Sequence, residues 1–168
     1  MLEKLDLLIL DNVFQTIADW WMDQTGKNNF WLARDTITLS AVLFFVFVGF
    51  NLSSLNIVCG ILVLPIFYKL VKSCEKAEKQ SESFGKCMNP LRNFAPHGIE
   101  RTVFVLLFIL NTSFWVMRCL EFGFGPPMRD IPSLLGFALY ICGMYFAACT
   151  PKPPSRLKAG NKLATHSA

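Results

Sequence analysis

Residues 36–71 read TITLSAVLFFVFVGFNLSSLNIVCGILVLPIFYKLV and carry no charge before Lys69. A helix in the core of a water-soluble domain needs a polar face, which this stretch lacks. As one helix rising about 1.5 Å per residue, it would be about 54 Å long, whereas the hydrocarbon core of a bilayer is about 30 Å thick. The polar cluster from Asn51 to Ser54 is the place where it can fold back. The stretch therefore predicts a transmembrane helical hairpin with arms over residues 36–50 and 55–70.

Both arms of this hairpin are short for a complete crossing. They hold 15 and 16 residues, whereas a transmembrane helix needs about 20. We therefore expect a thin bilayer, a turn at the level of the headgroups, or incomplete penetration. Phe30, Trp31 and Arg34 precede the first arm and are expected to anchor it at the membrane interface.

The composition also points to a membrane protein. Of the 168 residues, 53% are hydrophobic and 17% are charged, and the mean hydropathy is +0.41, which excludes a disordered chain. The six cysteines form no CxxC pair, so we expect reduced thiols and no disulfide framework. The net charge of +4 comes with no nucleic-acid-binding motif, so no nucleic-acid partner is expected.

The remainder of the chain supplies further segments. Residues 72–101 mix Lys and Glu at helical spacing before a run of turn formers, which predicts a basic cytoplasmic extension of the second arm and then a loop. Residues 102–149 form a second transmembrane hairpin, with spans over about 99–120 and 131–149. Residues 150–168 predict a flexible cytoplasmic tail. The predicted fold class is an all-α integral membrane protein with four transmembrane helices in two hairpins.

Residues 1–23 predict an amphipathic helix at the cytoplasmic face or the interface, because apolar residues recur at three- and four-residue steps. The apolar stripe consists of Leu2, Leu5, Ile9, Val13, Ile17 and Trp20. The opposite face carries Lys4, Asp11, Gln15, Asp19 and Asp23.

This helix has a net charge of −4. Helices that adsorb to anionic lipid are usually basic, so we expect the acidic helix to dock on protein, either this chain's own basic loop or a partner. The alternative is a helix that lies at the headgroups, anchored by Trp20 and Trp21. The candidate partner-binding residues of the stripe are Leu5, Ile9, Val13, Ile17 and Trp20.

The basic residues predict the topology. Of the 16 Lys and Arg residues, all lie on the side of the termini and the 72–101 loop except Arg118 and Arg129. The positive-inside rule then puts both termini in the cytoplasm, and we expect a bacterial inner membrane. Arg118 is expected to snorkel at the outer end of the third span with Glu121, three residues later, as its partner.

Two of the spans carry further candidate residues. Asn111, Thr112 and Ser113 lie in the middle of the third span, where Asn111 and Ser113 either face a substrate or ion or make hydrogen bonds between helices and within their own helix. No ionisable residue lies deep in any span, which weighs against proton-coupled transport and voltage sensing. In the fourth span, small residues share a face that serves packing within the chain or contact with another subunit. These small residues are Gly136, Gly143 and Ala147.

No catalytic constellation, metal-ligand cluster or cofactor motif is recognisable, so we expect neither an enzyme nor a bound cofactor. The leading hypothesis is a non-enzymatic scaffold or accessory subunit of a larger membrane complex. Its expected partners are the lipid bilayer and other membrane protein subunits, further copies of itself included. One alternative is an oligomeric pore or transport protein. Another is a membrane-shaping hairpin protein, because a long apolar hairpin, a polar loop and a second apolar stretch are similar in layout to reticulon-like proteins.

Overall fold

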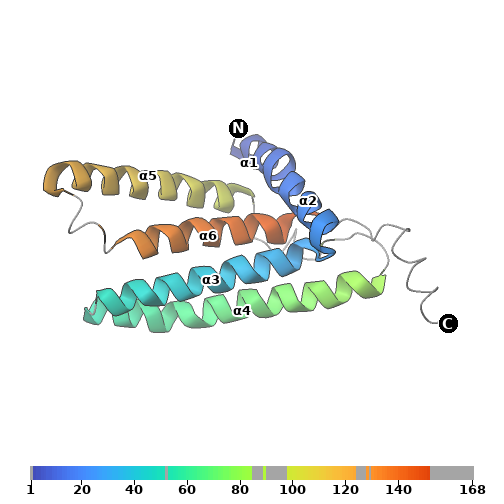
Figure 1. The fold of residues 1–168 in the computed structure, drawn as a ribbon, viewed down its shortest axis with the longest axis horizontal. Coiled ribbons are helices and arrows are strands. Elements are labelled where there is room, and N and C mark those ends of the chain that lie inside the picture. Colours follow the sequence, from blue (N-terminus) through green and yellow to red (C-terminus); the bar gives the residue numbers. More distant parts are fainter. Residues whose placement is uncertain are drawn as a thin grey trace.

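The computed structural model describes residues 2–51, 53–84, 89, 98–123, 128 and 130–151. An N-terminal segment of three short helical elements precedes four long helices (Figure 1). The N-terminal segment consists of α1 (Leu2–Ile9), the π-helical turn η1 (Leu10–Phe14) and α2 (Gln15–Thr25). The long helices are α3 (Asn29–Phe50), α4 (Ser54–Phe84), α5 (Gly98–Phe122) and α6 (Ile131–Ala148).

Each long helix contains a segment long and apolar enough to cross a membrane. The predicted all-α fold class, with four candidate spans after an N-terminal helix, is confirmed. α5 and α6 begin and end within two residues of the predicted spans. Of the predicted extension and loop over residues 72–101, residues 85–88 and 90–97 lie outside the described residues, as do residues 152–168 of the predicted tail.

The expectation of short hairpin arms is wrong. α3 begins at Asn29, seven residues before the predicted start, and its 22 residues make a helix about 33 Å long. The side-chain oxygen of Asn28 accepts a hydrogen bond from the backbone N–H of Trp31 at 3.1 Å and so caps the helix. Phe30, Trp31 and Arg34, the predicted interfacial anchor, therefore lie within α3 and its candidate span. α4 contributes a candidate span of 25 residues, Asn56–Gln80.

The turn of the first hairpin lies where the polar cluster predicted it. The backbone N–H of Asn51 donates to the carbonyl of Phe47 at 3.0 Å, which ends α3. The side-chain amide of Asn56 donates to the carbonyl of Asn51 at 2.8 Å, and its backbone N–H donates to the hydroxyl of Ser53 at 3.2 Å. These side chains satisfy backbone groups that the two helix ends leave unpaired. α4 then continues past its apolar part to Phe84, as predicted.

The closest helix contact joins α3 to α6 through small residues. A Cβ atom on Gly143 would lie 2.5 Å from Cγ1 of Ile37, and one on Gly136 would lie 3.2 Å from the carbonyl oxygen of Ser40. The hydroxyl of Ser40 also donates to the carbonyl of Gly136 at 2.6 Å. Gly136 and Gly143 therefore serve packing within the chain, the first of the two alternatives. Ala147, the third small residue of that face, is buried as well.

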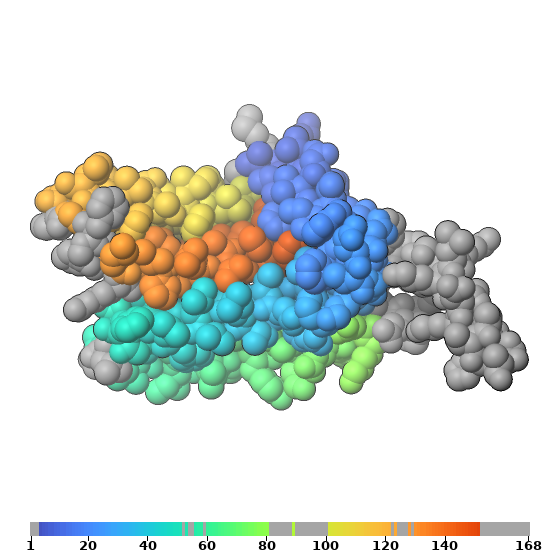
Figure 2. Space-filling model, viewed as in Figure 1, coloured from blue at the N-terminus to red at the C-terminus, as the bar shows by residue number. Residues whose placement is uncertain are grey.

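α5 and α4 form the outer edges of the bundle. Figure 2 shows α5 along the upper edge and α4 along the lower edge, with α6 and α3 between them. Only 6% of the α5 span is buried, against 44% of the α6 span. Most of the α5 surface is therefore available to lipid or to another protein.

Candidate functional site

A buried ion pair fixes the N-terminal segment to the bundle. Nε of Arg101, in α5, donates to Oδ1 of Asp6, in α1, at 3.0 Å, and a terminal guanidinium nitrogen donates to Oδ2. The hydroxyl of Tyr145, in α6, donates to Oδ1 of the same carboxylate at 3.0 Å. Asp6 is 1% exposed and Arg101 is 5% exposed. This charge site joins three elements that are distant in sequence.

The hydrogen-bond geometry of the charge site makes the interaction both strong and specific in orientation. A bidentate contact between a guanidinium and a carboxylate is among the stronger hydrogen-bonded pairs and fixes the orientation of both groups. The guanidinium carbon of Arg101 also lies 5.6 Å from the centre of the Tyr145 ring. The ring of Phe14 stacks on the ring of Tyr145, with the two ring centres 4.6 Å apart. The charge site therefore sets the position of α1 and of the π-helical turn.

The π-helical turn changes which face of the N-terminal segment packs inward. A π-helical turn adds a residue to one turn of a helix, so it rotates the residues that follow it. The buried face runs through Asp6, Leu10 and Ala18. A stripe of apolar residues at regular helical spacing does not predict this buried face, because the first residue of the face, Asp6, carries a carboxylate.

The predicted apolar stripe lies mostly outside. Leu5, Val13, Ile17 and Trp20 are between 41% and 59% exposed. Ile9 is half-buried and packs against the core. Of the two docking alternatives for the acidic helix, the Asp6–Arg101 pair realises contact with this chain's own basic segment, whose last residue is Arg101.

A carboxamide cluster, formed by Gln15, Asn29 and Asn89, surrounds the end of α6. Nδ2 of Asn29 donates to the carbonyls of Phe146 at 2.9 Å and Cys149 at 2.8 Å. Nδ2 of Asn89 donates to the same Cys149 carbonyl at 2.7 Å. The last carbonyls of a helix have no partner within the helix, so these amides replace water there.

Gln15 completes the carboxamide cluster from α2. Its side chain donates to the carbonyl of Thr150 at 2.9 Å and accepts from the backbone N–H of Thr150 at 2.9 Å. The prediction that Gln15 lies on the solvent-facing side of the N-terminal helix is wrong. The register change at the π-helical turn brings it to the chain that leaves α6.

At the opposite end of the bundle, Arg118 pairs with Asp130 and not with Glu121. The guanidinium donates to the Asp130 carboxylate at 3.0 Å, whereas Glu121 is exposed. Asp130 immediately precedes α6, and the fold brings its carboxylate to the guanidinium of Arg118 in α5. Glu121 is only three residues from Arg118 in the same helix but does not pair with it. The pair edges a crevice of about 130 Å³. Its lining residues are Phe47, Asn111, Phe114, Trp115, Arg118, Asp130, Ser133 and Leu134.

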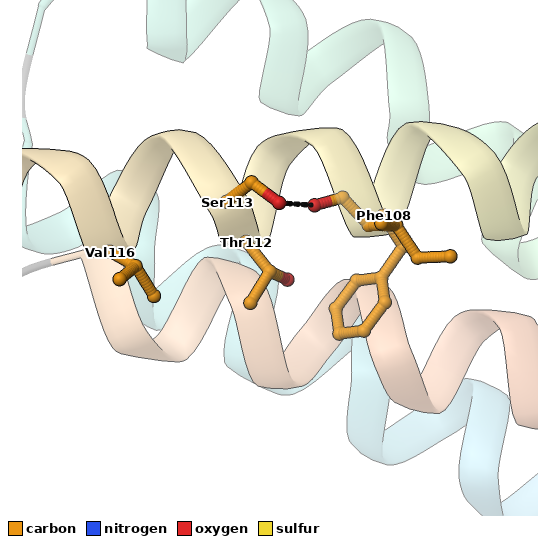
Figure 3. A pocket seen from close by; sticks show the side chains of 5 residues that line it. Phe108, Thr112, Ser113 and Val116 are labelled. Atoms are coloured by element: carbon orange, nitrogen blue, oxygen red, sulfur yellow. Dashed lines mark hydrogen bonds between the residues drawn. The ribbon is translucent and has the colours of Figure 1, made fainter.

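A second, open groove of about 390 Å³ runs along the other flank of α5. In Figure 3, Phe108, Thr112 and Val116 extend toward α6, and Ser113 lies on the far side of the helix. The hydroxyl of Ser113 donates to the carbonyl of Ile109 at 2.8 Å, which is the bond within its own helix that we weighed as the alternative. Oγ1 of Thr112 is buried and has no hydrogen-bond partner within the described part of the chain.

The described residues bring no three His, Cys, Asp or Glu side chains together in a way that could hold a metal ion. Comparisons of this chain with known protein families, with curated proteins and with solved structures gave no match. The charge site and the carboxamide cluster both tie the N-terminal segment to the bundle. The first joins Asp6 to α5 and α6, and the second joins Gln15 to Thr150, just beyond α6.

Proposed function

We propose that this chain is a non-enzymatic, multi-pass membrane protein that acts as a scaffold or accessory subunit of a larger membrane complex. The observation that carries the proposal is the N-terminal segment. The charge site and the carboxamide cluster fix this segment to the bundle, yet its apolar stripe is exposed. A fixed helix with exposed apolar residues is a typical docking surface for another protein.

The charges beside the stripe favour protein over lipid as the partner. Asp11 and Asp23 are exposed on the same segment. Interfacial helices that bind anionic lipid carry Lys and Arg instead. The partner surface that fits is therefore an apolar stripe flanked by basic side chains. The charge distribution of the chain supports a topology with both termini in the cytoplasm.

Affinity purification in mild detergent from the native membrane tests the proposal. The unaltered chain should recover at least one further protein in stoichiometric amount. A variant with Val13→Ser, Ile17→Ser and Trp20→Ser should lose that protein and keep its own helix content, because these side chains do not contribute to the buried face.

A matched control replaces exposed polar residues of the same segment, Asn12→Ser and Thr16→Ser, and should retain the partner. Purification of the unaltered chain with no stoichiometric partner would sink the proposal. So would equal recovery of the partner by the triple variant.

A further inference from the structure

Asn111 places a carboxamide at the middle of the α5 span. The span runs from Arg101 to Glu121, so Asn111 lies ten residues, or about 15 Å, from the charged residue at either end. A hydrocarbon core about 30 Å thick puts this side chain at the centre of the bilayer.

This carboxamide is both exposed and unpaired. Asn111 belongs to the exposed residues of α5, at the edge of the crevice. Within the described part of the chain, no hydrogen bond to its side chain is present, whereas Ser113 two residues later is bonded to its own helix. An amide in hydrocarbon without a hydrogen-bond partner is costly, and membrane helices relieve that cost by pairing across a helix–helix contact.

We propose that α5 pairs with α5 of a second copy of this chain and that the two Asn111 carboxamides hydrogen-bond to each other. A carboxamide carries both a donor and an acceptor, so it is complementary to itself. A second copy with the same topology presents Asn111 at the same depth, and a two-fold axis along the membrane normal brings the two side chains together. An unrelated helix would need its own polar group at that depth.

The side chains around Asn111 fit this contact. Leu107 and Phe114 lie one turn from it on the same side of α5, and Leu110 lies beside them; the three are 47%, 63% and 66% exposed. Their spacing of three and four residues is the pattern of side chains that pack between two nearly parallel helices. The pairing surface adjoins the crevice that Asn111 and Phe114 line together with residues of α6. It is separate from the apolar stripe of the N-terminal segment.

Self-association of the purified full chain in phosphatidylcholine vesicles tests the pairing, with energy transfer between labelled copies measured against dilution in lipid. The unaltered chain should form dimers. Asn111→Val should lower the association constant about tenfold, which corresponds to about 1.4 kcal/mol. Ser113→Ala is the matched control and should leave association unchanged, because its hydroxyl already bonds to Ile109. Circular dichroism checks that each variant keeps its helix content.

Oxidative cross-linking locates the contact face. Leu107→Cys should give a covalent dimer, and Ile109→Cys should not, although Ile109 is 53% exposed, because it lies on the opposite side of α5 from Asn111. The unsubstituted chain, run in parallel, accounts for the native cysteines. A monomer at all lipid ratios, a larger oligomer, or equal cross-linking at both positions would overturn the proposal. These measurements use the chain alone, so they do not depend on the partner proposed for the N-terminal segment.

Discussion

Asp6 and Arg101 lie 95 residues apart in sequence, yet their side chains form a bidentate ion pair in which they are 1% and 6% exposed. Tyr145 closes the pair from α6. An ion pair removed so completely from water is a strong determinant of geometry. Burial of either charge is energetically acceptable only while the opposite charge lies beside it.

Removal of one partner from this pair should therefore be far more damaging than removal of both. We expect Asp6→Leu to lower the free energy of unfolding in detergent by about 3–5 kcal/mol, because it leaves the Arg101 charge buried without a counter-charge. Asp6→Leu combined with Arg101→Leu should recover most of that loss. Denaturant titration of the four proteins in a double-mutant cycle gives the coupling between the two residues.

The pair of Arg34 and Glu78 supplies the control. Its atoms lie 3.3 Å apart, and its side chains are 28% and 25% exposed. Loss of that pair through Glu78→Gln should cost about 1 kcal/mol or less. If Asp6→Leu cost no more than Glu78→Gln, the charge site would not have the role that we assign to it.

A methyl group at Gly143 should separate α3 from α6. Its Cβ would lie 2.5 Å from Cγ1 of Ile37, so Gly143→Ala should destabilise the fold by about 1–3 kcal/mol. Gly49→Ala, in α3, is the control, because no atom lies within 4 Å of its Cβ position. The thermal unfolding temperature in detergent should fall for the first variant only. Equal behaviour of the two would exclude a close contact at Gly143.

Loss of the carboxamide of Asn29 should loosen the junction between the N-terminal segment and the bundle. Asn29→Leu removes one donor to each of two carbonyls at the end of α6, and the loss of a hydrogen bond costs about 0.5–1.5 kcal/mol. Trypsin should then cut faster after Lys27, which lies between α2 and α3. Asn12→Leu, at an exposed position of η1, is the control and should leave the cleavage rate unchanged. An unchanged rate for Asn29→Leu would contradict the assigned role.

The first hairpin should cross the membrane completely, because α3 is about 33 Å long by its 22 residues. A cysteine at the first residue of α4, Ser54→Cys, should react with a membrane-impermeant maleimide added to intact cells. Lys27→Cys, beyond the other end of α3, should react only after permeabilisation. Protection of Ser54→Cys from both sides would favour the membrane-shaping alternative instead.

The fold could be read from the sequence to a large extent. Few folds accommodate long uncharged runs that are interrupted at Asn51 and Ser53, and the thickness of a membrane constrains the lengths of the helices that cross it. The start of α3 was missed because Phe30 and Arg34 suggested a boundary, whereas the capping signal of Asn28 just before them marked the true helix start.

The polar sites could not be read in the same way. A search for a regular helical period does not detect a π-helical turn, so it assigns Gln15 to the solvent-facing side. The pairing of Asp6 with Arg101 depends on tertiary structure, as does the choice of Asp130 over Glu121 by Arg118. One signal was present: Asp6 interrupts an apolar run, LDLLIL, and Arg101 opens another.

The contact between α3 and α6 also imposes an order on biogenesis. Among the four described long helices α3 is synthesised first and α6 last, yet the hydroxyl of Ser40 donates to a carbonyl of α6, that of Gly136. Until α6 is inserted, the groove on α3 that receives Gly143 faces lipid, and Asp6 lacks the hydroxyl of Tyr145. A nascent chain stalled before Ile131 is therefore a recognisably incomplete product, with polar groups displayed to the insertion machinery and to membrane proteases.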